Sequence, residues 1–434
     1  MDFFYFLSTL TSFLIGFSLI AGIHELGHLA MAKWCGMDVK KYMIFFPPKL
    51  FSKKWKGTEY GIGSVPLGGF VEVSGMGEQM ETSQEPLTKG DFRAKPTWQR
   101  ALVMIGGVLF NLISAYLLIA CLYMSVGVGY IAKEELNRHG IAPSKLGIRM
   151  GFERGDRVLQ VNGKNFKKVE EVMATSYKQS ETTYTLERDG KIMTVTVSPE
   201  TKKEASQKRE MLFVPLMPSV IATVASGSVA QKAGLQQGDR IISINGKPTP
   251  YHDDLQEALL NEKEGAVITI IYERDKEKHT THAVLTTDRK LGVLLAQKLT
   301  YERYGLFKAL VASGKKVFAV LMSQIYGLSS IMRGKRSFSK SLQSPIQMAS
   351  WFGKAKSASD FWWLIALLSI MIALMNVLPL PALDGFHLLI ILIEMITGKR
   401  PSPAWYARLQ VAGVGSLGAL TVFLLMRDIL KLLS

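Results

Sequence analysis

Four long stretches of the sequence contain no charged residue. They lie at 3–23, 101–132, 361–383 and 409–426. At about 1.5 Å per residue, roughly 20 helical residues cross the hydrocarbon core of a bilayer, so each stretch suits one span. The first stretch has no basic segment before it and no small-residue cleavage site after it, which argues against a cleaved signal peptide. The sequence therefore predicts a membrane protein with four transmembrane helices.

The positive charge of the chain is concentrated beside these stretches. The formal net charge is +16, and seven lysines but only one acid, Asp38, lie at 33–56. Lys399, Arg400 and Arg408 crowd the connection between the last two stretches. Basic loops stay on the cytosolic side, where they contact anionic lipid headgroups. Both termini and the long middle segment are then expected outside the cytosol, and no aromatic-interleaved basic motif indicates nucleic acid.

The middle segment contains an internal repeat. GFERGDRVLQVNGK at 151–164 aligns without gaps on GLQQGDRIISINGK at 234–247, with seven of fourteen positions identical. Alternating strands and an Asp189-Gly190 turn signal follow, which predicts two compact β-rich domains. The repeated pattern resembles PDZ domains of bacterial membrane and periplasmic proteases, which can bind a peptide end as an added strand. The alternative is that the repeat only excludes bulky molecules from the rest of the protein.

The first apolar stretch ends in the motif HELGH, residues 24–28. On a helix, His28 lies one turn beyond His24 and about 40° around the axis, so both imidazoles can reach one metal ion. Glu25 lies between them in angle, close enough to hydrogen-bond a water on that metal without being a ligand. These are the parts of the H-E-x-x-H metalloproteases, which bind zinc.

Two histidines leave a tetrahedral zinc ion short of a ligand. Asp384 is the leading candidate, because an isolated carboxylate inside an apolar segment needs a partner. Pro379 and Pro381 interrupt the helix just before it and can turn the carboxylate toward the first span. His387, one turn further on, is the alternative ligand.

Together, these motifs resemble the site-2 protease family over nearly the whole chain. The shared features are HELGH, the segment NVLPLPALDG at 376–385 and the PDZ-like pair between the second and third spans. The resemblance implies a zinc metalloendopeptidase of the bacterial inner membrane, with periplasmic PDZ domains and an active site toward the cytosol. It implies substrates that are single-span membrane proteins of the anti-sigma factor type, already trimmed outside, and remnant signal peptides. It also implies zinc ligation by His24, His28 and Asp384, catalysis by Glu25, and binding of the substrate backbone by Asn376.

The segment PLGGFVEVSGMGE at 66–78 resembles the family's membrane-associated β segment. A strand there can pair with an unwound substrate helix, which makes Phe70, Val71, Glu72 and Val73 candidate substrate-binding residues. Glu72 replaces the family's usual basic residue. A plain surface hairpin is the alternative interpretation of this segment.

The expected fold is a multi-pass α-helical membrane protein with a membrane-associated β segment and two inserted extracytoplasmic PDZ domains of the β-rich α+β class. Its parts are expected at 1–32 (first span with HExxH), 33–97 (cytosolic loop with the β segment), 98–127 (second span), 128–212 and 213–300 (PDZ domains), 301–358 (amphipathic region on the membrane surface), 359–398 (third span with LDG) and 404–430 (fourth span). An inactive PDZ scaffold and a membrane metal-binding protein are the alternative functions. A scaffold would gain nothing from an intact base beside three candidate ligands, and a metal carrier would be expected to have polar residues along several spans, which this sequence lacks. The oligomeric state is not predicted.

Overall fold

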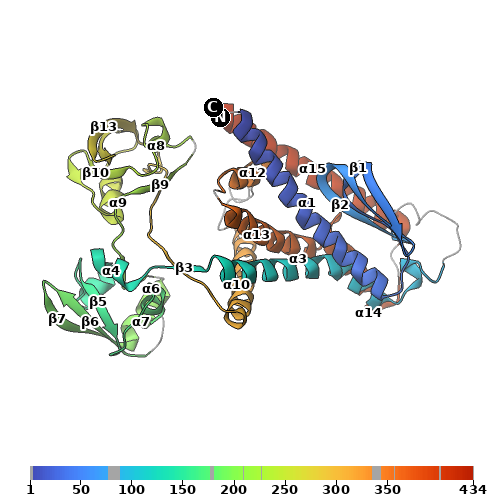
Figure 1. Cartoon of the computed structure of the whole chain (residues 1–434), viewed down its shortest axis with the longest axis horizontal. Helices are drawn as coiled ribbons and strands as arrows, with labels where there is room; N and C mark the ends of the chain where they lie inside the picture. The colour runs from blue at the N-terminus through green and yellow to red at the C-terminus, as the bar shows by residue number, and fades with distance from the viewer. Residues whose placement is uncertain are drawn as a thin grey trace. The chain divides into compact units, whose positions relative to one another are not determined.

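The chain folds into two compact units. The computed structural model describes residues 3–76, 88–175, 180–208, 210–225, 227–334, 344–355, 357–399 and 402–433. The first unit comprises Met1–Gly127 and Arg303–Ser434, and the second comprises Val128–Glu302 (Figure 1). The second unit is therefore an insertion into the first.

The first unit is mainly helical. Its elements are α1 (Phe3–Trp34), β1 (Val39–Trp55), β2 (Thr58–Val73), the short 3₁₀ helix η1 (Phe92–Ala94), α3 (Thr97–Ser125), α10 (Leu306–Met332), α12 (Pro345–Gly353), α13 (Ala358–Val377), α14 (Asp384–Thr397) and α15 (Pro403–Leu433).

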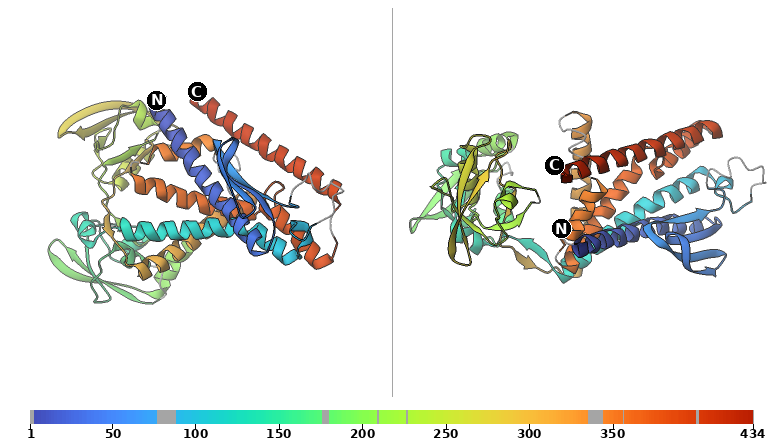
Figure 2. Two further views of the ribbon diagram at one scale, coloured as in Figure 1. Left: turned by 45° about the vertical axis from the view of Figure 1, so that its right-hand side comes forward. Right: turned by 90° about the horizontal axis from the view of Figure 1, so that it is seen from above.

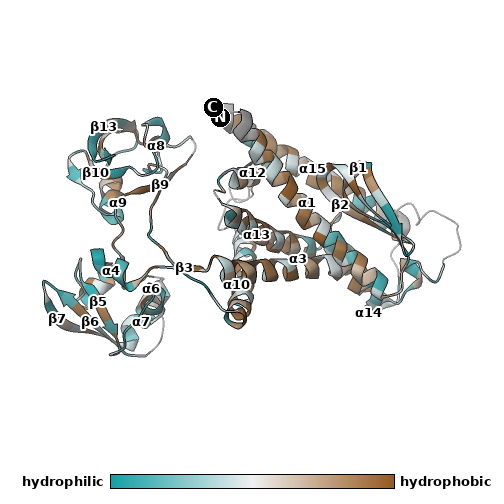
Figure 3. Ribbon diagram, viewed as in Figure 1, coloured by the Kyte–Doolittle hydropathy of each residue, from teal (hydrophilic) through white to brown (hydrophobic). Residues whose placement is uncertain are grey.

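Among the described residues, four helices of this unit are long and apolar enough to cross a membrane. The candidate segments are Leu7–Trp34, Thr97–Ser125, Ala358–Val377 and Ala404–Asp428. Figure 3 shows hydrophobic residues along α1, α3, α13 and α15. The prediction of a membrane protein with four candidate spans is confirmed at this level. The amphipathic helix expected in 301–358 corresponds to α10, which carries three lysines and is not among the four.

Helix α3 is the centre of the first unit, because α1, α10, α13 and α14 all pack against it. Its closest contact is with α1. A Cβ atom built on Gly27 would lie 2.2 Å from the carbonyl oxygen of Gly106, so no larger residue fits there without separating the helices. Small residues that let two helix backbones approach closely are a common basis of packing within membranes. This contact holds the end of α1 that carries HELGH against α3.

The third predicted span is broken. Helix α13 ends at Val377, and α14 begins at Asp384. Pro379 and Pro381 lie in the break, where proline removes backbone donors and disfavours a continuous helix. A Cβ on Gly385 would lie 2.4 Å from two carbonyl oxygens at the end of α13, so the turn closes only because residue 385 is glycine.

Strands β1 and β2 form an antiparallel hairpin that packs against α1 (Figure 2). β2 begins at Thr58, earlier than the expected segment at 66–78, and ends at Val73. Residues 77 and 78 of that segment lie outside the described residues. The sequence pattern missed the first half of the hairpin because VKKYMIFFPPKLFSKKW in β1 does not alternate between apolar and polar residues.

The second unit contains two similar modules of antiparallel strands and short helices. Its elements are β3 (Val128–Tyr130), α4 (Lys133–His139), β4 (Ile141–Pro143), α5 (Lys145–Arg149), β5 (Arg157–Val161), α6 (Val169–Thr175), β6 (Thr182–Arg188), β7 (Lys191–Val197), α7 (Pro199–Lys208), β8 (Phe213–Pro215), β9 (Ile221–Val224), α8 (Val229–Lys232), β10 (Arg240–Ile244), β11 (Lys247–Pro248), α9 (His252–Leu260), β12 (Val267–Arg274), β13 (Glu277–Val284), β14 (Val293–Leu295) and β15 (Thr300–Glu302).

The two modules have separate cores and sheets. The first has the sheet β5-β6-β7 and the pair β4-β8, and the second has β11-β10-β12-β13 and the pair β14-β9. The outermost strands, β3 and β15, pair with each other, with Tyr130 opposite Thr300. The chain therefore enters and leaves this unit at adjacent strands.

The repeated sequence GDR forms the same interaction in both modules. Asp156 accepts hydrogen bonds from Arg188 at 2.7 and 2.8 Å, and Asp239 accepts two from Arg274 at 2.7 Å each. Both aspartates are 1% exposed. A buried carboxylate needs such a partner, which explains why the acidic residue recurs together with an arginine on a later strand.

Candidate metal centre

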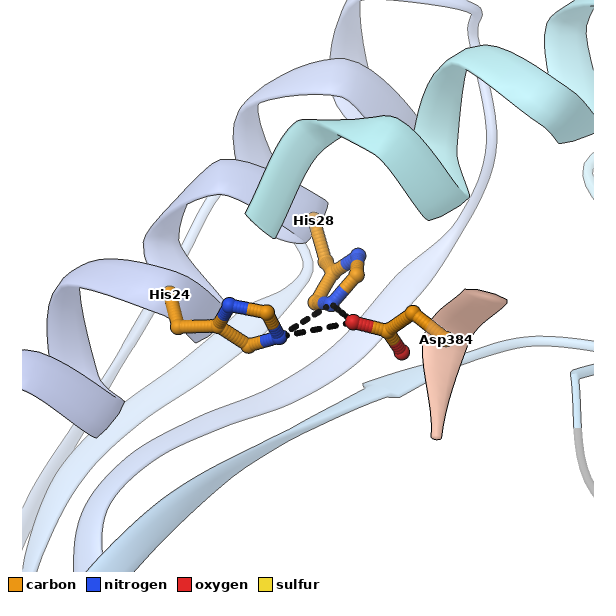
Figure 4. Close-up of side chains that lie close together, drawn as sticks. All are labelled: His24, His28 and Asp384. Atoms are coloured by element: carbon orange, nitrogen blue, oxygen red, sulfur yellow. Dashed lines mark hydrogen bonds and ion pairs between the residues drawn. The ribbon is translucent and has the colours of Figure 1, made fainter. Parts of the chain in front are cut away.

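Three side chains from two distant helices meet inside the first unit. His24 and His28 project from the same face of α1, and Asp384 is the first residue of α14 (Figure 4). The Nε2 atoms of the histidines lie 3.1 Å apart. Oδ2 of Asp384 lies 2.8 Å from Nε2 of His24 and 3.3 Å from Nε2 of His28. Among the described residues, these three side chains form a group that could hold a metal ion, with their ligand atoms within 4.8 Å of one another.

The separations between these atoms fit a small tetrahedral ion. Zinc bonds of about 2.0–2.1 Å imply roughly 3.4 Å between neighbouring ligand atoms, slightly more than the three distances observed. Two imidazole nitrogens and one carboxylate oxygen are donors that zinc accepts in catalytic sites, with the fourth position left for water or substrate. His24 is 7% exposed and His28 is 3% exposed, so the centre is shielded from bulk solvent.

Helix α3 orients both imidazoles, although it supplies no candidate ligand. Nδ1 of His28 donates to the carbonyl oxygen of Val103 at 2.7 Å, which leaves Nε2 facing the centre. The side-chain amide of Asn111 lies 3.3 Å from Nδ1 of His24. A histidine that ligates through Nε2 carries a proton on Nδ1, so the oxygen of the amide should face it. This orientation also gives a donor to Oδ1 of Asn111, a buried atom that has no other partner among the described residues.

Gly107 makes room for His24. A Cβ atom at this position of α3 would lie 2.5 Å from the imidazole ring. Gly107 and Asn111 lie one helical turn apart, so α3 contacts two sides of the same ring. Neither role could be predicted from the sequence, because an Asn and a Gly in an apolar helix have many structural explanations.

The alternative ligand His387 contacts residues of α15 rather than the two histidines of α1. Its Nδ1 atom contacts the hydroxyl group of Tyr406, and its Nε2 atom lies 3.0 Å from the amide nitrogen of Gln410. Both partners belong to α15. The geometry therefore favours Asp384 over His387 as the third candidate ligand.

The candidate base Glu25 faces strand β2. Its Oε2 atom accepts a hydrogen bond from the backbone amide of Val71 at 3.0 Å. The strand predicted to contact substrate thus lies directly beside the HELGH motif. The side-chain amide nitrogen of Asn376 is 3.4 Å from Nε2 of His24, so the end of α13 also lies beside the HELGH motif.

The other candidate substrate-binding residues differ in their surroundings. Phe70 stacks on Phe46 of β1, with ring centres 6.2 Å apart. Glu72 forms an ion pair with Lys41 at 2.9 Å, and this contact raises the pKa of the lysine. Val73 is only 2% exposed, packs in the core and is paired with Val39 of β1, so it is the least accessible of the four residues.

A buried ion pair secures the far end of α14. Arg100 of α3 donates to Glu394 at 2.6 Å, and their side chains are 6% and 11% exposed. The pair links α14 to α3, the helix that also contacts the two histidines.

Comparison with known proteins agrees with a membrane-embedded metalloprotease. The chain belongs to peptidase family M50, whose model matches residues 12–420. This confirms the resemblance to the site-2 proteases and makes the protein a zinc metalloprotease, and four of its described helices are long and apolar enough to cross a membrane.

Several relatives are similar over most of their length. The chain is 28% identical to the regulator of sigma E protease of Haemophilus influenzae, over 98% of this chain and 100% of the relative. It is 27% identical to the protease RseP of Yersinia pestis, over 90% and 91% of the two chains. A relative from Ralstonia nicotianae that carries zinc metalloprotease in its name is 28% identical, over 98% of both chains.

Proposed function

We propose that this protein is an intramembrane zinc protease that hydrolyses peptide bonds within the transmembrane segments of single-span membrane proteins. The observation that carries the proposal is the position of His24, His28 and Asp384. They meet between α1, α3 and α14, in the helical unit that contains the candidate spans. An ordinary soluble protease has no reason to bury its metal centre in apolar helices, where polar groups are costly.

In this proposal, His24, His28 and Asp384 hold the zinc ion and Glu25 is the catalytic base. Zinc in such a site lowers the pKa of a bound water toward about 7 and polarises the scissile carbonyl group. Glu25 takes a proton from the attacking water and passes it to the nitrogen of the leaving amine. The Val71 amide holds the Glu25 carboxylate at the edge of the centre, which keeps it off the metal and available for the proton.

The substrate must unwind, because a helical peptide bond has its carbonyl and amide groups hydrogen-bonded. We assign this step to strand β2 around Phe70 to Val73 and to the side-chain amide of Asn376. A strand edge supplies backbone donors and acceptors to an extended segment, and the Asn376 amide offers a further hydrogen bond close to the metal. The contact between Val71 and Glu25 places the strand within reach of the scissile bond.

Two of the relatives are named for sigma E regulation or as RseP, which supports substrates of the anti-sigma factor type, cleaved after a first cut outside the membrane. Remnant signal peptides are single apolar helices and fit the same site. The basic loops near Lys33–Lys56 and Lys399–Arg408 support an inner-membrane location with the active site toward the cytosol and the second unit in the periplasm. We assign the two modules of that unit to tandem PDZ domains that filter access to the protease.

The proposal is tested with the full-length protein in detergent and in liposomes. A model single-span substrate with a short external tail is incubated with the purified enzyme, and the new termini are located by mass spectrometry. We expect one zinc ion per chain, cleavage inside the apolar segment, loss of cleavage after chelation, and recovery on adding zinc. Cleavage only outside the apolar segment would contradict the proposal. Bound zinc without cleavage indicates a metal-binding protein, and neither zinc nor cleavage indicates an inactive scaffold.

A further inference from the structure

Helix α15 contributes no candidate ligand, yet it contacts the turn that presents Asp384. In this turn Ala382 has φ of 78°, in the left-handed region that residues other than glycine rarely adopt. Such a conformation persists only when surrounding contacts hold it. Ala382 lies two residues before Asp384, so a change in its backbone conformation would redirect the carboxylate.

Gln410 of α15 supplies the contact that holds this turn. Its Oε1 atom accepts a hydrogen bond from the backbone amide of Ala382 at 2.7 Å. The side chain is 6% exposed although it belongs to a helix that crosses an apolar layer. A buried amide in such a helix needs partners for its donors and its acceptor, and here the acceptor is used on the turn.

The amide nitrogen of the same side chain binds the first turn of α14. It lies 3.0 Å from Nε2 of His387 and donates to the hydroxyl group of Tyr406 at 3.2 Å. One side chain thus contacts the residues on both sides of Asp384 in the chain, Ala382 before it and His387 after it.

The backbone of α15 also approaches the turn closely. A Cβ atom on Gly413 would lie 2.3 Å from the Cβ atom of Pro381 and 2.8 Å from its carbonyl carbon. Gln410 and Gly413 are three residues apart and therefore share one face of the helix. That face of α15 packs closely against the segment between α13 and α14.

We propose that Gln410 is a positioning residue for the metal centre, acting through the backbone of Ala382 to hold Asp384 within reach of His24 and His28. This inference rests on the proposed ligand role of Asp384. It gives the fourth span a function in the chemistry, and it explains why a polar side chain is buried in that span.

The test compares Gln410→Met with the parent, using the full-length protein loaded with zinc or with Co²⁺. Methionine has a similar length and keeps the packing, but it cannot bond the Ala382 amide. We expect about tenfold faster zinc release or more, the size of effect typical when a residue that orients a metal site is lost, and an altered visible spectrum of the Co²⁺ form. Thr421→Ala, at an exposed position of the same helix, is the matched control and should match the parent in both measurements.

Two further variants separate positioning from a general loss of stability. Gln410→Asn keeps the amide but shortens the side chain, so its zinc release should also be faster than that of the parent. Replacing Ala382 with Gly removes the conformational penalty of the turn. We therefore expect Ala382→Gly to recover part of the zinc retention lost in Gln410→Met.

The outcomes distinguish this inference from the proposed function. If the parent binds zinc and cleaves substrate while Gln410→Met keeps the parental zinc release and Co²⁺ spectrum, the positioning role is wrong and the proposed function stands. A lower melting temperature with unchanged metal properties would also overturn it, since that is the effect of a merely structural residue. A parent that holds no zinc would refute both.

Discussion

The carboxylate of Glu25 accepts a hydrogen bond from the backbone amide of Val71 at 3.0 Å. This contact joins the helix that carries both histidines to the strand proposed to bind substrate. It uses a backbone donor, so the side chain at position 71 is free to vary without losing it. An extended substrate bound beside Val71, as proposed, would therefore lie next to Glu25.

Glu25→Gln should abolish proteolysis while the protein still binds one zinc ion. The oxygen of a glutamine side chain can still accept the Val71 hydrogen bond, but an amide cannot take up the proton. Zinc content by mass spectrometry and cleavage of the model substrate are measured on the same preparation. Retained activity in this variant would refute the role of Glu25 as the base.

Asp384→Asn should reduce both zinc retention and cleavage, because a neutral amide is a poorer zinc ligand than a carboxylate. His387→Ala is the matched variant one turn away, and it should retain zinc since its ring contacts Tyr406 and Gln410 instead. Equilibrium dialysis against a zinc buffer measures both affinities. The assignment is reversed if His387→Ala loses the metal and Asp384→Asn keeps it.

Gly107→Ala should weaken zinc binding although it adds only one methyl group. The new Cβ atom would lie 2.5 Å from the ring of His24, so the imidazole must move away from the centre. Displacing a ligand in this way typically costs about 10–100-fold in metal affinity. Gly22→Ala is the control on α1, where the nearest atom to a new Cβ is 3.5 Å away. Equal zinc affinities in the two variants would show that Gly107 has no such role.

Removal of the second unit should change access to the active site and leave its chemistry intact. Tyr130 and Thr300 are paired residues of β3 and β15, so 131–299 can be replaced by an Asn-Gly turn that closes a hairpin. We expect the shortened protein to bind zinc and to cleave a short-tailed substrate as the parent does. A substrate with a folded external domain of about 100 residues, with a radius of gyration near 13 Å, should become cleavable only after the deletion.

The same experiment decides between filtering and docking. If the modules recruit substrates by binding a peptide end, cleavage should fall for both substrates after the deletion. If the bulky substrate stays uncut while the short one is still processed, the second unit is not the filter.

The sequence predicted the features that depend on local periodicity. The apolar stretches correspond to candidate spans, and the spacing of His24 and His28 places both Nε2 atoms at one point on α1. The repeated GDR segments were recognisable in the sequence because the same residues recur at the same spacing. The structure gives a reason for the recurrence, since both modules bury the aspartate in the same way. In each case the signal lies within one element or one repeat.

The remaining part of the site depends on contacts between distant residues. Asn111 lies 87 residues from His24, and Arg100 lies 294 residues from Glu394. The role of Gln410 depends on the backbone of Ala382, whose positive φ has no signature in a sequence that carries alanine there. The pairing of residues from different helices is set by packing, and a single sequence does not record it.

In the proposed metal centre His24 and Asp384 are 360 positions apart in the chain, so the two ligands are synthesised at different times. A ribosome adds residues at about 5–20 per second, N-terminus first, so Asp384 follows His24 by roughly 20–70 s. During that interval α1 has been synthesised with both histidines and Glu25, but Asp384 has not. The proposed centre therefore stays incomplete while the later apolar segments of the same chain are still being made. With Asp384 as the proposed third ligand, the metal centre is complete only when synthesis of the chain is nearly finished.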